Sequence, residues 1–274
     1  MNTLPFMTRI PGISGAQTEA FQRDGAVLLP GLFRDWVDDI AAGIEQNLRE
    51  PGQYAAENLA DDEAGRFFDD YCNWRRIPAF SKVILESGLA AAASRLMQSR
   101  KVQFFHDHVL VKEPGTAKAT PWHQDAPYYF VDGGHTVSFW VPVDPVDEST
   151  LRLIAGSHKW EKLVLPTRWL SDEEFYAEAG DYLPVPDPDA EPDKFAVLEW
   201  AMEPGDAVAF HYRTVHGARG NPSKRRRRAF SMRVVGDDAR YVSRAGPTSP
   251  PYPGHGMTDG QVLREDWFPF LTVD

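Results

Sequence analysis

The segment VQFFHDHVLV, residues 102–111, marks a change in the periodicity of the chain. Before this segment, apolar residues recur every three or four positions, as in amphipathic helices. From residue 102 onward apolar and polar residues alternate, as in β-strands with one buried face. Further candidate strands, separated by Pro/Gly turns, are residues 135–143, 151–154, 206–211 and 227–235. Helices first and short strands afterwards predict a mainly β fold with flanking helices.

Helical patterns are found in the first hundred residues. Gly25 follows a short predicted helix and precedes a strand that ends at Pro30. A second helix carries an apolar stripe from Phe33 to Leu48, which must pack against something larger. The predicted elements of this region are helices at 17–23, 33–48 and about 87–98 and a strand at 26–29.

Composition and charge exclude several classes of protein. The chain has 42% hydrophobic residues, and its 40 acidic residues against 29 Lys plus Arg repel polyanions, so we expect no nucleic-acid partner. It contains no run of about 20 apolar residues and its start lacks a signal sequence, so we expect no membrane association and a cytoplasmic location. Cys72 is the only cysteine, which rules out an internal disulfide and a thiolate cluster. A metal site must therefore use His, Asp and Glu.

One His-x-Asp motif occurs among the eight histidines, at His123 and Asp125. Residues two apart on a strand point to the same side, so both side chains can reach one ion if this stretch is extended. His216 is the best third ligand, because it follows a predicted strand and precedes a Gly-containing turn. Two histidines and one carboxylate form the facial triad that leaves coordination positions open on Fe(II).

The basic run of residues 224–228 leads directly into a predicted strand. It could be a targeting or nucleic-acid patch, but we favour a local anion-binding role. Arg227, eleven residues after His216, heads the strand, and its guanidinium can form a bidentate pair with the distal carboxylate of a dicarboxylic co-substrate.

At this point the sequence resembles the phytanoyl-CoA dioxygenase family of Fe(II)/2-oxoglutarate oxygenases, which also includes ectoine hydroxylase. The matching segments lie in the family's order between about residues 21 and 235. They are FQRDG (21–25) with LLP (28–30), PWHQD (121–125), LRLIAGSH (151–158) and HGA (216–218) through Asn221 to Arg227.

The resemblance implies a double-stranded β-helix of the jelly-roll, cupin-like type, with the metal near one open end. It implies that His123, Asp125 and His216 bind Fe(II) as the catalytic metal, that Arg227 binds 2-oxoglutarate, and that Trp140 lies beside this co-substrate. Two departures stand out. Ala218 occupies a position where many relatives have serine, which suggests one hydrogen bond fewer to 2-oxoglutarate, and Ser149-Thr150 replaces a frequent Asn-Gly.

Several other residues are candidates for the site. His106 and His108 share one face of the strand at 102–111; if that face is interior they line the site, with His108 nearer the co-substrate, and otherwise they lie on the surface. Tyr128 and Tyr129 form either a substrate wall or core packing. Arg233 shares the face of Arg227 and meets either an acidic substrate group or a neighbouring carboxylate.

The remaining histidines have no predicted part in the chemistry. His211 is out of phase with His216 and is expected to be structural, as is His158 in its Gly-Ser-His turn. His135 and His255 are expected at the surface.

We interpret residues 1–274 as one oxygenase domain, in which helices at about 15–100 brace a core at about 102–236. The polar, proline-rich segment 166–194 is expected to be a lid that orders when substrate binds. The predicted activity is hydroxylation of an unactivated carbon of a small organic substrate, using Fe(II), 2-oxoglutarate and O2 and releasing succinate and CO2. The alternative is a non-redox, cupin-type isomerase or ligand-binding protein, against which Arg227 argues. Asp125 argues against a halogenase, since halogenating relatives lack that carboxylate.

Overall fold

The computed structural model describes residues 12–59, 64–166 and 181–273 of the 274-residue chain. The elements in chain order are α1 (Gly15–Asp24), β1 (Ala26–Leu29), η1 (Arg34–Trp36), α2 (Val37–Arg49), β2 (Ala56–Glu57), β3 (Phe67–Tyr71), α3 (Pro78–Glu86), α4 (Leu89–Met97), β4 (Val102–Lys112), β5 (Thr120–His123), η2 (Ala126–Tyr128), β6 (Val131–Asp132), β7 (Thr136–Pro142), β8 (Leu151–Ile154), η3 (Ser157–Lys159), β9 (Val197–Glu199), β10 (Ala207–Phe210), β11 (His216–Ala218), β12 (Arg227–Val235), β13 (Arg240–Tyr241) and β14 (Phe270–Leu271).

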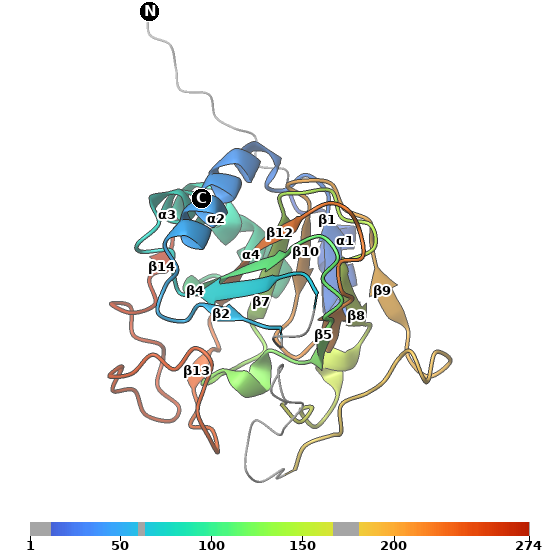
Figure 1. The fold of residues 1–274 in the computed structure, drawn as a ribbon. Helices are drawn as coiled ribbons and strands as arrows, with labels where there is room; N and C mark the ends of the chain where they lie inside the picture. The colour runs from blue at the N-terminus through green and yellow to red at the C-terminus, as the bar shows by residue number, and fades with distance from the viewer. Residues whose placement is uncertain (1–11, 60–63, 167–180, 274) are drawn as a thin grey trace, which may run out of the picture.

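Two antiparallel sheets make up the core (Figure 1). The larger sheet has the order β1-β10-β7-β12-β4-β3-β2, with β14 also paired to β4, and the smaller sheet has the order β5-β11-β8-β9. Leu110 and Trp140 of the larger sheet and Leu151 and Leu153 of the smaller sheet share one buried apolar cluster, so the two sheets face each other. This is the double-stranded β-helix, and the predicted fold class is confirmed.

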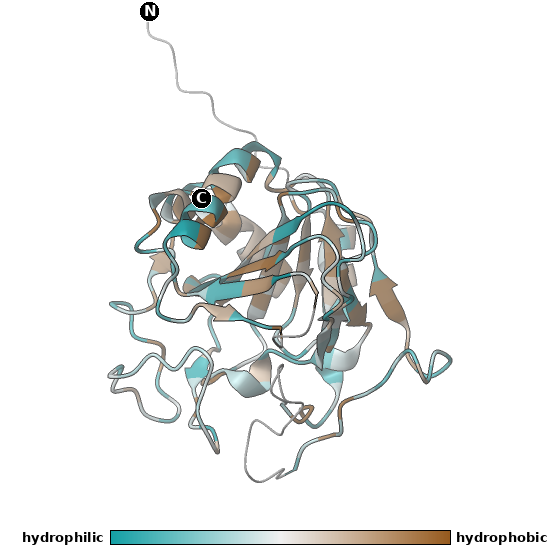
Figure 2. Ribbon diagram, in the orientation of Figure 1, coloured by the Kyte–Doolittle hydropathy of each residue, from teal (hydrophilic) through white to brown (hydrophobic). Residues whose placement is uncertain are grey.

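Helices α2, α3 and α4 cover the outer face of the larger sheet (Figure 1). The ring of Phe80 in α3 stacks on Phe230 of β12 with centroids 4.1 Å apart. Gly43 of α2 permits this packing, because a Cβ atom there would lie 2.3 Å from the Phe80 ring. The strands beneath the helices are predominantly hydrophobic, as Figure 2 shows. No helix in the described part of the chain is long and apolar enough to cross a bilayer.

Helix α1 ends at the glycine that the sequence indicated, and its start is capped. Ser14 and Gln17 form a reciprocal capping box at its start. Gly25 ends it with φ +77°, and a Cβ atom at Gly25 would lie 2.3 Å from Nδ1 of His158. This position therefore requires glycine both for its backbone conformation and for the space beside the histidine.

The predicted strands and helices agree with the structure to within a few residues, but helix α3 and several strands, the longest of them β3, were not predicted. Helix α3 starts with Pro78 at its first turn. Strand β3 contains two buried carboxylates, Asp69 and Asp70, so it lacks the apolar and polar alternation of a half-buried strand. Each carboxylate has a tertiary partner: Asp69 bonds to His108, and Asp70 accepts from Asn47 at 2.7 Å.

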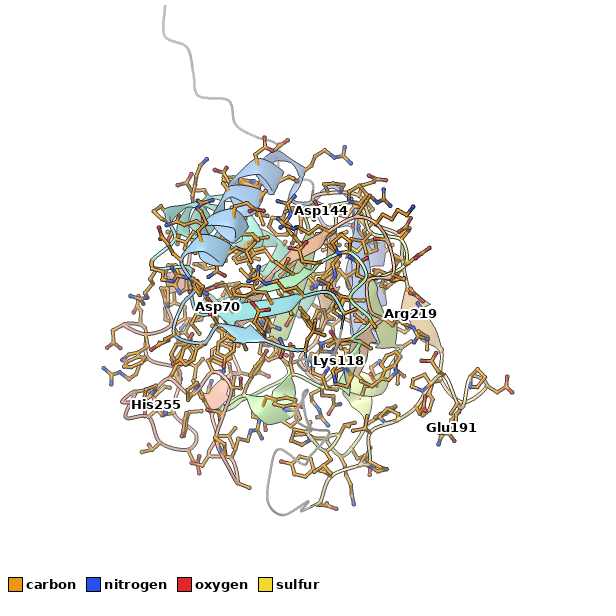
Figure 3. The ribbon with its side chains drawn as sticks, viewed as in Figure 1. Asp70, Lys118, Asp144, Glu191, Arg219 and His255 are labelled. Atoms are coloured by element: carbon orange, nitrogen blue, oxygen red, sulfur yellow. The ribbon has the colours of Figure 1, made fainter. Side chains whose placement is uncertain are left out.

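The segment predicted as a lid is described only in part, because residues 167–180 lie outside the described residues. Residues 181–194 run along the outside of the smaller sheet (Figure 1). Arg152 of β8 holds this part through two hydrogen bonds of 2.7 and 2.8 Å to Asp189, and Glu191 points away from the sheets (Figure 3). The described part of the predicted lid, residues 181–194, is therefore attached to the outer side of the smaller sheet.

Candidate metal and co-substrate site

A cavity of about 550 Å³ opens between the two sheets, and residues of both sheets line it. All ten predicted site residues lie on its wall. The face of β4 that carries His106 and His108 is therefore the interior one, which decides between the two alternatives for these residues. The ten residues are His106, His108, His123, Asp125, Tyr128, Tyr129, Trp140, His216, Arg227 and Arg233.

Three candidate ligands converge where β5 and β11 pair. His123, the last residue of β5, is opposite His216, the first of β11, and their ring centroids are 4.2 Å apart. Oδ1 of Asp125 lies 3.8 Å from Nε2 of His123 and 3.9 Å from Nε2 of His216. One ligand atom from each residue lies within 4.8 Å of the other two, and all three side chains are buried.

Asp125 reaches this position by a different backbone path from the one predicted. Strand β5 ends at His123, and Asp125 has the helical angles φ −70° and ψ −39° at the start of η2. Both side chains reach one site, as expected, but the extended conformation on which that expectation depended ends at His123. The short helix formed by Ala126-Pro127-Tyr128 turns the chain immediately after the strand and brings the carboxylate back towards His123.

The tautomer of each histidine is set by a backbone carbonyl. Nδ1 of His123 donates to the Pro121 carbonyl at 2.8 Å, and Nδ1 of His216 donates to the Thr214 carbonyl at 2.9 Å. Each Nε2 is then the unprotonated nitrogen directed towards Asp125. Burial lowers the pKa of both rings, that of His123 to about 3, so both are neutral at physiological pH.

The second oxygen of Asp125 is held by the larger sheet. Oδ2 accepts from the Ser138 hydroxyl at 3.2 Å and from Nε of Arg233 at 3.3 Å. Burial raises the pKa of Asp125, but the charge of the adjacent Arg233 opposes burial, and the pKa lies below its ordinary value. Of the two alternatives for Arg233, the structure contains the salt bridge to a neighbouring carboxylate.

Arg227 lies in the same cavity at the start of β12, opposite Lys112 of β4. Its side chain is 4% exposed, and its guanidinium carbon lies 5.5 Å from the centroid of the Trp140 ring. Nε has no hydrogen-bond partner, and no ion pair involves Arg227 among the described residues. Burial lowers the pKa of Arg227 to about 10, so the buried guanidinium is still charged at neutral pH.

The two neighbours of Arg227, Arg226 and Arg228, do not line the cavity, as expected where side chains alternate along an extended chain. Arg226 pairs with Glu45 and Glu113, and Arg228 pairs with Glu45 and Asp144. The run is therefore one inward cation flanked by outward salt bridges, which agrees with a local role and disfavours a nucleic-acid patch.

Sequence reasoning missed several polar and aromatic residues of the cavity. The one with the clearest contact is Asp69, whose Oδ2 lies 2.7 Å from Nε2 of His108. Its strand β3 was not predicted, and a lone aspartate carries no recognisable motif. The other missed lining residues include Tyr54, Asn58, Tyr71 and Ser249.

The remaining histidines lie outside this cavity. His211 bonds to the Gly134 carbonyl, and its ring lies 5.5 Å from that of His158. His135 and His255, expected at the surface, are both half-buried. His255 accepts a hydrogen bond from the backbone of Met257 and lies near the edge of the molecule, in the C-terminal segment (Figure 3).

The chain is similar to known proteins in sequence and in structure. A model of the phytanoyl-CoA dioxygenase family matches residues 21–229. A probable phytanoyl-CoA dioxygenase of Caenorhabditis elegans is 30% identical over 150 residues, covering 52% of this chain and 46% of that protein. A phytanoyl-CoA dioxygenase of Arabidopsis thaliana is 25% identical over 183 residues, covering 64% of this chain and 61% of its own. The matches thus span about half the length of these curated relatives.

Solved structures share the fold over most of the chain. SnoK, a non-heme α-ketoglutarate-dependent carbocyclase of nogalamycin biosynthesis, superimposes with a TM-score of 0.72 at 22% identity, covering 95% of this chain and 97% of its own. EctD from S. alaskensis, solved with 2-oxoglutarate and 5-hydroxyectoine, superimposes with a TM-score of 0.66 at 20% identity. The match covers 92% of this chain and 86% of EctD. At such identities the likeness establishes the jelly-roll architecture.

Proposed function

Since the chain belongs to the phytanoyl-CoA dioxygenase family, we propose that it is an Fe(II)- and 2-oxoglutarate-dependent oxygenase that hydroxylates an unactivated carbon of a small organic substrate. The observation that carries the proposal is one cavity holding both a two-histidine, one-carboxylate cluster and a buried arginine without an ion pair among the described residues. A cupin-type isomerase or a ligand-binding protein has use for the cluster but has no need of the arginine.

The candidate ligands fit a divalent transition metal. His123 and His216 supply neutral imidazole nitrogens, and Asp125 supplies an ionised oxygen, so no ligand must lose a proton to bind the ion. Two nitrogens and one oxygen are the donor set of non-heme Fe(II) oxygenases, which leave open positions for co-substrate and O2. Ser138 and Arg233 occupy Oδ2 of Asp125 and leave Oδ1 for the metal.

The residues around Arg227 fit 2-oxoglutarate. A buried guanidinium is costly without an anion, and a bidentate pair with a carboxylate satisfies its charge and its donors together. Two further buried groups of the wall make no hydrogen bond within the described part of the chain, Nε1 of Trp140 and Oγ of Ser231. We propose that the distal carboxylate of 2-oxoglutarate pairs with Arg227 and that its carbon chain lies against the Trp140 ring.

Iron bound here would supply the activation of O2, coupled to the oxidative decarboxylation of 2-oxoglutarate to succinate and CO2, for attack on a C–H bond. The protein's part is orientation. Arg227 fixes the far end of the co-substrate, while Ser138 and Arg233 keep Asp125 oriented and ionised. The apolar residues of both sheets keep water away from the reacting atoms.

Hydroxylation must be distinguished from other outcomes, because the similar solved structures include a carbocyclase and an epimerase. The test is a screen of small molecules for stimulated succinate formation with Fe(II), 2-oxoglutarate and isotopically labelled O2. A hydroxylase gives a product that has gained one labelled oxygen atom. Ring closure gives a product that has lost two hydrogen atoms, and epimerisation leaves the mass unchanged, so either product would replace the hydroxylase assignment within the same class. If no compound stimulated succinate formation and 2-oxoglutarate did not bind, the oxygenase proposal would be wrong.

A further inference from the structure

Two histidines of β4 present unprotonated nitrogens to the cavity. Nδ1 of His106 donates to the Asp107 carbonyl at 3.2 Å, so Nε2 of the neutral ring is an acceptor. His106 is 2% exposed, lines the cavity, and its Nε2 makes no hydrogen bond within the described residues. A buried acceptor without a partner is costly, so a ligand that donates to it gains affinity.

His108, two residues further along the strand, also lines the cavity but is held through its other ring nitrogen. Its Nε2 lies 2.7 Å from Oδ2 of Asp69, and Asn58 donates to the other oxygen of the same carboxylate. In the tautomer that donates from Nε2 to Asp69, Nδ1 is left as an acceptor, and it makes no hydrogen bond among the described residues. Residues two apart on a strand share a face, so both acceptors serve the same part of the cavity.

Aromatic rings surround these two acceptors. Tyr54 and Tyr71 stack with centroids 4.8 Å apart, and the Tyr71 ring meets the edge of His108 at 5.5 Å. Tyr129 meets the edge of His106 at 5.1 Å. Such walls favour a ring-shaped molecule, because ring faces pack on aromatic side chains with little loss of conformational freedom.

The formal charges of the loaded cavity cancel. A divalent metal, Arg227 and Arg233 carry as much positive charge as 2-oxoglutarate, Asp125 and Asp69 carry negative charge. Among the lining residues that the structure describes, no cation then remains to pair with an anionic substrate, while a neutral molecule leaves the balance undisturbed.

We propose that this part of the cavity binds a neutral, ring-bearing substrate through hydroxyl groups that donate to His106 and His108. This inference rests on the proposed function for the position of the metal and the co-substrate. It assigns His108 to the substrate, whereas the sequence suggested contact with the co-substrate. It also disfavours acyl-CoA thioesters, whose phosphates find no free cation among the described lining residues.

The test compares three probes that share one benzene ring and differ in the groups that they present. Resorcinol presents two hydroxyl donors, its dimethyl ether presents none, and isophthalate presents two carboxylates. Binding is measured by saturation-transfer NMR on protein loaded with Zn(II), a redox-inert substitute for Fe(II), and 2-oxoglutarate. We expect roughly millimolar affinity for resorcinol and about tenfold weaker binding of its dimethyl ether, which loses hydrogen bonds to buried acceptors. Isophthalate is expected to show no binding.

The variants His106→Phe and His108→Phe keep a ring but remove the acceptor. Each is expected to weaken resorcinol binding about tenfold and to leave the weak binding of the dimethyl ether unchanged. The matched control is His255→Phe, outside the cavity, which is expected to bind resorcinol as the wild type does. Circular dichroism of each variant checks the fold, and loss of resorcinol binding without loss of structure supports the assignment.

Several results would overturn the inference. Equal binding of resorcinol and its dimethyl ether would show that the hydroxyl groups make no hydrogen bond. Preferred binding of isophthalate or palmitoyl-CoA would show that the cavity receives an anion, and absence of resorcinol binding would remove the hydroxyl subsite. If 2-oxoglutarate binds while resorcinol does not, the substrate inference fails and the oxygenase proposal stands. If 2-oxoglutarate does not bind, the oxygenase proposal itself fails.

Discussion

Replacing Arg227 with methionine should make the ligand-free protein more stable while removing its affinity for 2-oxoglutarate. Burial lowers the pKa of Arg227 from an ordinary 12.5 to about 10, although the charge of Asp144 opposes this. A change of one in pKa corresponds to about 1.4 kcal/mol, so the buried charge costs about 3 kcal/mol without its anion. Methionine has similar length and no charge, but it loses the contact of the guanidinium with the Trp140 ring, which contributes about 1–2 kcal/mol. We expect a net gain of about 1–2 kcal/mol, or a few degrees in Tm.

The affinity for 2-oxoglutarate should change in the opposite direction. Removing one partner of a buried charge pair costs about 2–5 kcal/mol, which corresponds to a loss of about 30-fold to several thousand-fold. Isothermal titration of Mn(II)-loaded protein with 2-oxoglutarate measures the loss, and thermal unfolding of the ligand-free protein measures the gain. Mn(II) affinity itself should be nearly unchanged, since Arg227 contacts none of the candidate ligands.

The neighbouring Arg226 provides the matched control. Its side chain is 38% exposed and pairs with Glu45 and Glu113, and exposed pairs contribute at most about 1 kcal/mol. Arg226→Met should therefore leave 2-oxoglutarate affinity unchanged. If Arg226→Met weakened 2-oxoglutarate binding as much as Arg227→Met, or if Arg227→Met lowered the Tm of the ligand-free protein, the reasoning about a buried, unpaired cation would be refuted.

Three further predictions concern the metal, a turn and a buried amine. His216→Ala should weaken Mn(II) binding at least tenfold in equilibrium titrations, because two remaining ligands hold the ion poorly, whereas His255→Ala should not; equal Mn(II) affinities would reject the triad. Gly25→Ala should lower the free energy of unfolding by about 1–2 kcal/mol or more, because Gly25 has φ +77° and a Cβ atom would collide with His158; unchanged urea unfolding would contradict this. Burial and the charge of Arg227 lower the pKa of Lys112 from 10.5 to about 6, so between these pH values the unfolded chain binds more protons and stability should rise with pH. The contribution is at most about 1.4 kcal/mol per pH unit, and urea unfolding from pH 7 to 9 should show a smaller slope for Lys112→Met than for wild type; identical slopes would contradict the assignment.

The sequence was informative where one local pattern determines the outcome. Alternation in 102–111 and 227–235 predicted the two long strands, and the phase of the second correctly separated inward Arg227 from outward Arg226 and Arg228. Period-two patterns are local, so they survive in a single sequence without knowledge of the tertiary partners.

The elements that escaped prediction depend on tertiary contacts. Strand β3 was missed because its buried Asp69 and Asp70 look like surface residues until His108 and Asn47 are known to meet them. The helical conformation of Asp125 was missed because the His-x-Asp spacing does not show where the strand ends. The same two residues can lie on one continuous strand or at the junction of a strand and a short helix. In both cases hydrogen bonds formed across the fold outweighed the local pattern.

Strand β12 couples the helical layer to the candidate chemistry. Its inward residues include Arg227, Ser231 and Arg233, which line the cavity, while the ring of Phe230 between them packs on Phe80 of α3. Because the strand is one rigid ladder with β4 and β7, the helices that cover its outer face fix its position relative to the smaller sheet, which carries two of the candidate metal ligands. The distance between Arg227 and the three candidate metal ligands is thus determined by how the two sheets and the helices pack. No single residue of the cavity determines it. The helices that the sequence indicated only as bracing therefore help to set the distance between Arg227 and the candidate metal ligands, on which the proposed binding of 2-oxoglutarate depends.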